Sequence, residues 1–311
     1  NPPVLDPIST PTKIAAITLS GTKPANTSIT VNGTQRVALD GLTTWSCSYT
    51  LSEGSSQLSV KAVNTAGNES LPATASVILD TTPPRIASTN PSNGSVLNNV
   101  AKIDVLITDG NTSVDLEASK TGANVKVSGQ MISGTWTIEN GHIIFTPAGI
   151  LTEGIYTATL YPADILGNKG AVSFSFIIDK TQPVVQSMTM DPASPHKAET
   201  VTFAITFSEE MLTGVQPLVS FSRGASYPTF AMTGNWINSK TWQGAYTFST
   251  NTGDGEYTVN VSLAKDSAQN TMNAQNAGTF ILDTVPLASP TVNPVTTPTK
   301  TPNQVLSCTK P

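Results

Sequence analysis

The chain offers few side chains whose type and spacing could perform catalysis. Its two histidines, His142 and His196, are far apart in the sequence, and no zinc-protease, serine-hydrolase or phosphate-loop motif is present. Glu209 and Glu210 could suggest the paired carboxylates of a glycosidase. Adjacent residues of a strand point to opposite faces, however, so this pair cannot flank one bond. We therefore expect a protein that is not an enzyme, with both histidines in exposed loops.

The two cysteines are too few for a disulfide framework. Cys47 lies in an alternating run with Trp45 and Tyr49, so its default role is that of a small buried hydrophobe. Cys308 aligns with Gly21 in the internal repeat described below. Two alternatives stay open for Cys308: a bridge across two strands of a complete further domain, or addition of the tail to the first domain of another molecule, near Cys47.

Two tryptophans could serve a binding function. Trp236 and Trp242 flank a loop-like stretch, and their even spacing would place them on one face of a continuous strand. Exposed aromatic rings of this kind could present a surface to sugars. The alternative is that both rings fill the core, since each domain needs one or two aromatic residues for packing.

The chain repeats itself. Asp80, Asp179 and Asp283 each follow an apolar strand end and precede a proline, and they lie 99 and 104 residues apart. A period near 100 is too long for a solenoid unit and suits a β-sandwich domain. Residues 2–24 also align with residues 289–311, with 11 identities in 23 pairs. The chain therefore reads as three domains followed by the first strands of a fourth.

The elements that must position these residues are antiparallel strands. Short runs alternate between apolar and polar residues and are separated by turn sequences such as Asn-Gly, which indicates half-buried strands. No ten-residue segment has helical spacing, so a parallel sheet with crossover helices is excluded. The rows expected to face the cores include Leu58, Val60 and Ala62; Ile103, Val105 and Ile107; Tyr156, Ala158 and Leu160; Val201, Phe203, Ile205 and Phe207; and Tyr257, Val259, Val261 and Leu263.

We predict an all-β protein whose domains are residues 1–81, 82–181 and 182–285. Residues 286–311 are expected to be a linker and the first strands of a further repeat. Short proline-containing linkers predict an extended rod, because proline holds a joint extended and stiff.

Composition narrows the class of protein. The net charge is −5 and the pI is about 5.0, which argues against binding of nucleic acid. No apolar run is long enough to insert this segment into a membrane. Charged residues are only 12 % of the chain, which is typical of exported all-β proteins. We expect an extracellular or cell-surface location.

Three motifs together resemble tandem bacterial immunoglobulin-like domains of adhesin stalks and other surface proteins. The first runs from Leu19 to Pro24 and continues at Ile29–Gly33 and Leu51–Leu58. The second is a five-residue corner that occurs at residues 64–68, 164–168 and 266–270. The third is Thr206-Phe207-Ser208-Glu209-Glu210-Met211. The resemblance covers the whole chain and implies immunoglobulin-like β-sandwiches, a fold that hosts many functions.

The resemblance also implies calcium. In related arrays, aspartates at the corner and at the domain exit bind Ca²⁺ between domains and stiffen the joint. Asp164 with Asp179, and Asp266 with Asp283, match that pairing. Asn64 stands at the corner of the first domain, which leaves Asp80 alone. The alternative is a plain turn, in which Asp or Asn bonds its own backbone two residues on.

The function expected from these observations is structural: a non-catalytic stalk segment of a secreted or cell-surface protein, able to assemble into a filament. Its expected partners are neighbouring repeats, other copies of itself, or a cell-surface glycan or protein. The rival interpretation is a carbohydrate-binding accessory module of an extracellular glycan-active enzyme.

Overall fold

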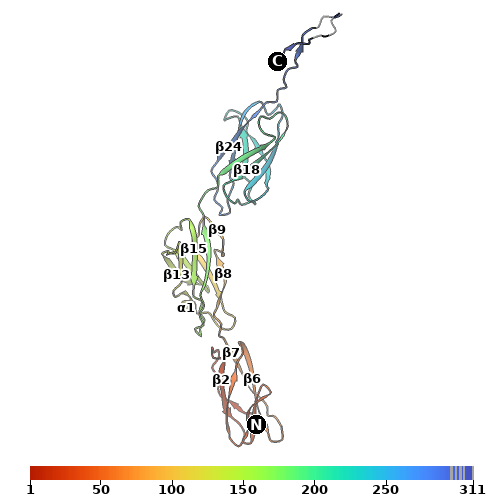
Figure 1. Cartoon of the computed structure of the whole chain (residues 1–311). Coiled ribbons are helices and arrows are strands. Elements are labelled where there is room, and N and C mark those ends of the chain that lie inside the picture. The colour runs from red at the N-terminus through yellow and green to blue at the C-terminus, as the bar shows by residue number, and fades with distance from the viewer. Residues whose placement is uncertain (295–296, 298–299, 301–302, 304, 310–311) are drawn as a thin grey trace. The chain divides into compact units, whose positions relative to one another are not determined.

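The computed structural model describes residues 1–294, 297, 300, 303 and 305–309 of the chain (Figure 1). The chain divides into two compact units, Asn1–Asp179 and Lys180–Pro311. The regular structure of the described residues is almost all β, and six of the sheets pack in pairs as three sandwiches of mainly antiparallel strands.

The first unit begins with a sandwich of a three-stranded sheet, β1-β2-β5, and a four-stranded sheet, β4-β3-β6-β7. Alternation builds these strands: on β6 Leu58, Val60 and Ala62 are buried, and the residues between them are more exposed. The strands are β1 (Val4–Leu5), β2 (Ala16–Thr22), β3 (Thr27–Val31), β4 (Thr34–Asp40), β5 (Thr44–Thr50), β6 (Gly54–Asn64) and β7 (Ala73–Leu79).

The second sandwich of this unit pairs the sheet β13-β14-β10-β8 with the sheet β12-β11-β15-β16-β9. One short helix, α1 (Leu116–Lys120), is capped by the Asp115 side chain, which accepts a hydrogen bond from the Ala118 amide. The strands are β8 (Arg85–Asn90), β9 (Val96–Leu97), β10 (Ile103–Thr108), β11 (Asn124–Val127), β12 (Gln130–Met131), β13 (Gly134–Glu139), β14 (His142–Pro147), β15 (Gly154–Leu160) and β16 (Val172–Ile178).

The second unit contains a third sandwich, with sheets β17-β18-β22-β21 and β20-β19-β23-β24. Its core is rich in aromatic rings, and Phe221 lies within contact distance of Phe248, Tyr257 and Phe280. The strands are β17 (Val185–Asp191), β18 (Thr200–Phe207), β19 (Leu218–Ser222), β20 (Phe230–Met232), β21 (Gly234–Trp236), β22 (Thr241–Thr247), β23 (Gly255–Ser262) and β24 (Gln275–Leu282).

In each sandwich the opening segment contacts both sheets. In the second, β8 pairs with β10 in one sheet, and β9 then pairs in parallel with β16 in the other. This arrangement confirms the predicted all-β class and tandem immunoglobulin-like sandwiches. The parallel pairing differs from the expectation of wholly antiparallel sheets, because an opening strand can switch sheets without a crossover helix.

The buried rows agree with the alternation in the sequence, with one exception at a strand end. Leu263 was expected to continue the row of Tyr257, Val259 and Val261, and that expectation is wrong. Leu263 follows the last residue of β23, its φ is +62°, and its side chain is 56 % exposed. The left-handed backbone at Leu263 ends the alternation, so its own side chain turns away from the core and Ala264 is buried instead.

The tail repeats the opening of the chain in structure as well as in sequence. Strand β25 (Thr291–Val292) pairs with β26 (Cys308–Thr309), and β1 pairs with β2 in the same register at a shift of 287 residues. The Asn293 amide donates to the Ser307 carbonyl, as the Asp6 amide does to the Ser20 carbonyl. The described tail residues therefore form a strand pair equivalent to the one that opens the first sandwich.

Candidate functional site at the joint of the first two sandwiches

The three corners predicted as a repeated motif fold in the same way. Asp164 Oδ1 accepts hydrogen bonds from the amides of Leu166 and Asn168, at 2.8 and 2.9 Å. The Asn168 side chain donates to Asp164 Oδ2, and Gly167 has a φ of +80°, which favours glycine. Asn64 and Asp266 accept the corresponding amide of the fifth corner residue. The plain-turn reading of these residues is therefore realised at every corner.

The register of the strands decides which aspartates can meet. β15 pairs with β16 from Gly154 opposite Ile178 to Leu160 opposite Val172. Asp164 follows the end of β15 at which this pairing finishes, and Asp179 follows the opposite end of the hairpin. Seven paired residues separate them, a length of roughly 20 Å at about 3.3 Å per residue. The pairing of Asp164 with Asp179 expected from the sequence is therefore wrong.

The same reasoning applies in the third sandwich. β23 pairs with β24 from Gly255 opposite Leu282 to Val261 opposite Gln275. Asp266 lies at the corner beyond the Val261–Gln275 end of this hairpin, and Asp283 lies beyond the Gly255–Leu282 end. The expected pairing of Asp266 with Asp283 also spans the length of a hairpin and is wrong. A corner aspartate and the exit aspartate of its own domain always lie at opposite ends.

The carboxylates that do meet in the first unit are those of Asp80, Asp109 and Asp164, with oxygens within 4.8 Å of one another. Asp80 is the exit residue of the first sandwich, and the other two belong to loops of the second. Asp80 and Asp164 are buried. Sequence reasoning set Asp80 aside and missed Asp109, which lies in the loop after β10. The sequence gives no sign that the corner of one sandwich meets the exit residue of the sandwich before it.

Hydrogen bonds between the two sandwiches surround this group. Thr112 donates its hydroxyl to Asp80 Oδ2 at 2.5 Å, and the Asn168 side chain donates to the Asp80 carbonyl at 2.9 Å. The Asn111 side chain donates to Glu53 at 2.9 Å. Burial raises the pKa of Asp80, but hydrogen bonds from Thr112 and Thr82 outweigh this and hold the pKa below its usual value. Asp80 is therefore charged at neutral pH.

The group has donor chemistry that fits a hard divalent cation. Calcium takes six to eight oxygen ligands, and carboxylates, loop carbonyls and water supply them. Among the described residues, no Lys or Arg forms a salt bridge with Asp80, Asp109 or Asp164. Carboxylates this close repel one another unless a cation or a shared proton intervenes. Asp164 already accepts three hydrogen bonds within its corner. At most one lone pair of its carboxylate is therefore left for a cation.

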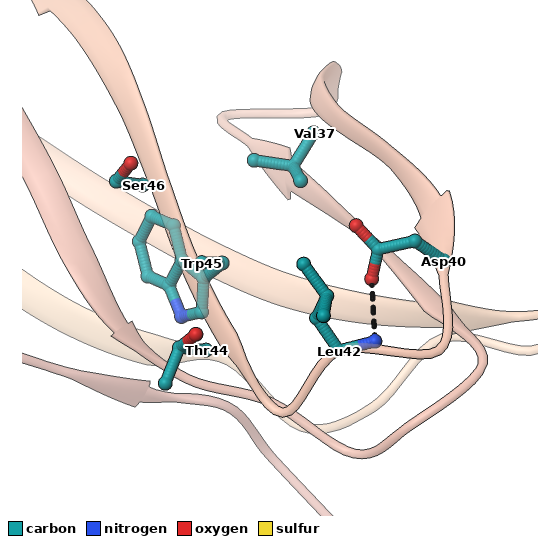
Figure 2. A pocket seen from close by; sticks show the side chains of 6 residues that line it. All are labelled: Val37, Asp40, Leu42, Thr44, Trp45 and Ser46. Atoms are coloured by element: carbon teal, nitrogen blue, oxygen red, sulfur yellow. Dashed lines mark hydrogen bonds between the residues drawn. The ribbon is translucent and has the colours of Figure 1, made fainter.

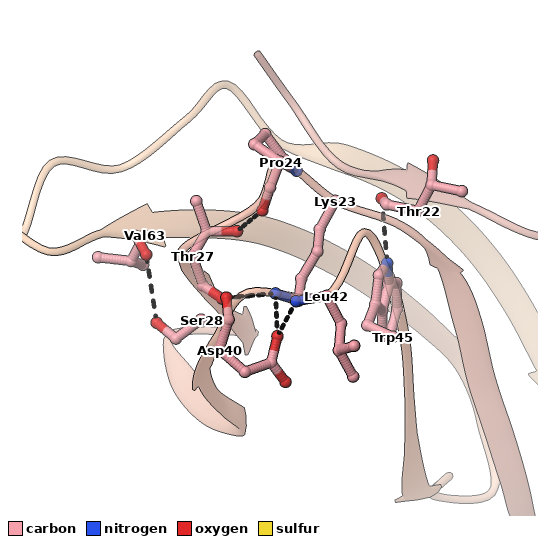
Figure 3. Close-up of polar contacts among 9 residues, drawn as sticks. All are labelled: Thr22, Lys23, Pro24, Thr27, Ser28, Asp40, Leu42, Trp45 and Val63. Atoms are coloured by element: carbon pink, nitrogen blue, oxygen red, sulfur yellow. Dashed lines mark hydrogen bonds and ion pairs between the residues drawn. The ribbon is translucent and has the colours of Figure 1, made fainter.

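A second polar cluster lies inside the first sandwich (Figure 3). The Lys23 side chain is fully buried, and its Nζ donates to the Thr27 carbonyl at 2.8 Å and to Asp40 Oδ1 at 2.7 Å. Asp40 Oδ1 also accepts from the Leu42 amide. The hydrogen bond from Lys23, together with that from Leu42, lowers the pKa of Asp40. This pair ties the loop after β2 to the end of β4.

A pocket of about 410 Å³ adjoins this pair, between the edge strands β4 and β5. Figure 2 shows Val37, Leu42 and Trp45 around it, together with Asp40. The Trp45 ring donates its N–H to the backbone carbonyls of Val4 and Thr22. The Asp40 carboxylate is held by Lys23 and the Trp45 N–H is bonded internally, so both polar groups already have partners within the sandwich.

The two histidines lie in different sandwiches. His142 begins β14 and is partly buried, so its expected place in an exposed loop is wrong; its Nδ1 lies 2.6 Å from the Asp104 carboxylate. His196 was expected in an exposed loop, and that expectation is wrong: it is 2 % exposed. Burial, only partly offset by Glu199, lowers its pKa. Its proline-rich surroundings suggested a loop but not that the loop closes the end of the core.

Trp236 and Trp242 face each other across β21 and β22. Trp242 is 1 % exposed and Trp236 packs against the same core. The Trp242 indole N–H donates to Gln216 Oε1, and the Trp236 indole N–H donates to the Val215 carbonyl. The alternative that both rings fill the core is therefore correct, and this pair is not an exposed platform for sugars.

The remaining sequence candidates are two glutamates and two cysteines. Glu209 and Glu210 follow the end of β18 rather than lying within a strand. Cys47 is partly buried on β5 and Cys308 is exposed, and both are free thiols. Burial raises the pKa of Cys47. Both cysteine alternatives raised by the sequence stay predictions.

No protein-family model matches the chain, and no curated protein matches it. Among solved structures, it is similar to titin domains at 11 % identity over 91 % of this chain and 99 % of that one, with a TM-score of 0.41. It is also similar to the Escherichia coli adhesin FdeC, at 16 % identity over 91 % and 96 %, with a TM-score of 0.36. A glucan-utilization protein of Bacteroides ovatus, SGBP-B, matches at 13 % identity over 97 % and 76 %, with a TM-score of 0.19. Likeness at this level concerns the fold alone.

Within the described part of the chain, no helix has the length and apolar character needed to cross a lipid bilayer.

Proposed function

We propose that this chain is a structural stalk segment of a secreted or cell-surface protein, in which consecutive sandwiches space other parts of the molecule. The observation that carries the proposal is the joint in the first unit. There the exit residue Asp80 receives hydrogen bonds from Thr112 and Asn168 of the following sandwich. A spacer needs such direct contacts because domains connected only by a flexible linker move independently.

We further propose that calcium stiffens this joint. Asp80, Asp109 and Asp164 gather at it, and their oxygens suit a hard cation. Extracellular modules bind calcium with dissociation constants of about 10⁻⁴ to 10⁻³ M. We expect affinity in that range, because few protein oxygens converge and water must complete the coordination.

The test measures the distance distribution between spin labels on exposed Ser48 and Thr146, in a Cys47→Ala, Cys308→Ser background. We expect a narrow distribution that Thr112→Val broadens, because this variant removes a hydrogen bond to Asp80. A distribution as broad as that of two freely moving domains, already in the parent protein, would contradict the stalk function.

The calcium arm compares excess EDTA with millimolar calcium in the same labelled protein. Asp109→Asn keeps an oxygen for the amides of Asn111 and Thr112 but removes the charge. We expect calcium to raise the melting temperature of the parent and not of this variant. Asp104→Asn, on β10 of the same sandwich, is the matched control and should respond like the parent. An equal melting temperature with and without calcium would remove calcium and leave the stalk proposal standing.

The rival carbohydrate-binding function is not proposed. Its specific residues were Trp236 and Trp242, and both indoles are engaged inside the third sandwich.

A further inference from the structure

The third sandwich is closed at one end by residues 192–199, the segment between β17 and β18 that carries His196. The His196 amide donates to the Ile281 carbonyl, and the Asp283 amide donates to the His196 carbonyl, at 2.8 and 2.9 Å. The Ile281 amide is bonded to the Ser194 hydroxyl. The segment is thereby fixed to the last two residues of β24 and to the exit residue Asp283.

The other two sandwiches are closed by the same backbone contacts. In the first, the Asp80 amide donates to the Thr12 carbonyl, and in the second the Asp179 amide donates to the Leu97 carbonyl. Thr12, Leu97 and His196 are therefore equivalent positions. Leu97 packs against its core, as expected of an apolar side chain. The third sandwich buries an ionisable ring at the position where the second packs a partly buried leucine.

The surroundings of His196 suit the neutral imidazole only. The ring stacks on Phe248 at 5.8 Å and 14° and meets Phe280 edge-on at 5.6 Å. Neither ring nitrogen has a hydrogen-bond partner among the described residues, and both are shielded from solvent. A buried polar atom without a partner costs free energy, and a buried charge costs more.

The charged groups near His196 are few. Glu199 is the closest, with Oε1 3.8 Å from Nδ1, a distance too long for a hydrogen bond. Lys197 and Asp283 line a surface pocket together with Glu199 and His196. The rings that contact His196 belong to Phe248, directly after β22, and to Phe280 on β24, and neither strand carries a charged side chain. Tyr257, which stacks on Phe280, has its pKa raised by burial and stays neutral. A protonated His196 would therefore have Glu199 as its nearest carboxylate, with no hydrogen bond to it.

We propose that His196 makes this closure acid-sensitive: protonation of the ring releases residues 192–199 from β24 and loosens the exit of the third sandwich at Asp283. In the released segment the imidazole is hydrated and binds a proton at its ordinary pKa of 6.5. In the closed segment it binds the proton only at lower pH, because burial disfavours the charged form. Above pH 6.5 the closure is independent of pH. Below it the open form gains one proton and is favoured, until the pH falls below the pKa of the closed form.

The experiment measures hydrogen exchange of the amides of Ile281 and Asp283 in the full chain, corrected for the intrinsic pH dependence of exchange. We expect the opening equilibrium constant to rise about tenfold for each unit of pH below 6.5, the slope for uptake of one proton. His196→Leu, which copies the second sandwich, should abolish this rise. His142→Gln removes the other histidine and should leave it unchanged.

Two further measurements protect the test against a variant that folds poorly. An NMR titration of the wild-type ring should show His196 still neutral at a pH where a free histidine is charged. Glu199→Gln keeps an oxygen but removes the charge that raises the pKa of His196. The opening equilibrium constant should therefore go on rising to lower pH than in the wild type. A wild-type opening constant that does not change with pH, or a rise that survives in His196→Leu, would overturn the proposal.

Discussion

At the scale of single residues, the buried Lys23 shows how a charge can hold a fold together. Its side chain is fully buried, yet its ammonium group donates hydrogen bonds to Asp40 and to the Thr27 carbonyl. Lysine is almost never fully buried unless it is paired. The methylene stem fills space between strands, while the charge fixes the chain after β2 against the end of β4.

Replacement of Lys23 tests this account. Lys23→Met keeps the stem but leaves the buried Thr27 carbonyl with one hydrogen bond fewer. We expect the free energy of unfolding of the first sandwich to fall by about 1–3 kcal/mol. Urea denaturation followed by hydrogen exchange of first-sandwich peptides measures it. Lys61→Met breaks an exposed pair with Glu69 and should cost less than about 1 kcal/mol. Equal losses in the two variants would contradict a special role for burial.

The residues that the sequence predicted well are those whose position follows from alternation. Ile103, Val105 and Ile107 are buried as expected because every second residue of a strand shares a face. His196 and Asp109 were missed for a different reason. Both lie in loops, where burial depends on which strand end a loop covers, and no periodic pattern records that.

At the scale of elements, hairpin register explains why the aspartate pairs expected from the sequence do not meet. The corner motif could be read from the sequence because a first Asp or Asn and a final Asn recur at fixed spacing, with glycine before the final Asn in two of the three corners and Gln269 in the third. Which aspartates meet could not be read in the same way. The two ends of a hairpin are distant in space although its residues are close in sequence, so Asp164 meets the exit of the preceding sandwich.

The tail offers a prediction at this scale. β25 and β26 reproduce β1 and β2, but in the first sandwich β2 also pairs with β5. Appending a second copy of residues 25–81 after Pro311 should supply the missing strands and add a fourth unfolding transition. Cysteine at the Gly21 position is an obstacle, because a Cβ on Gly21 would lie 1.9 Å from the Val4 carbonyl oxygen and 3.1 Å from the Trp45 ring nitrogen.

The fusion is therefore best made in two forms. With Cys308→Gly the fourth transition should occur at higher temperature than with Cys308 retained, because the glycine leaves room for the backbone carbonyl of the paired strand and for the indole. The control carries residues 25–81 but lacks residues 289–311, and should show no fourth transition. A tail-containing fusion that melts like this control would show that residues 289–311 are not the opening strands of a repeat.

At the scale of the whole molecule, the cores are separate. Each of the three hydrophobic clusters among the described residues draws its side chains from one sandwich only. A stalk benefits from this arrangement because damage to one module need not unfold the next. The aromatic cluster of the third sandwich is the clearest place to test it.

Phe221→Ala removes a fully buried ring that contacts Phe248, Tyr257 and Phe280. A change of this kind costs about 3–5 kcal/mol, so we expect the third sandwich to unfold at a much lower urea concentration. Hydrogen exchange at increasing urea, read peptide by peptide, reports each sandwich separately. Peptides of β2 to β7 should keep their wild-type midpoint, and Phe145→Ala should give the reciprocal result in the second sandwich. If Phe221→Ala also lowered the midpoint of the first sandwich, the modules would share stability, and a stalk of independent units would be the wrong description.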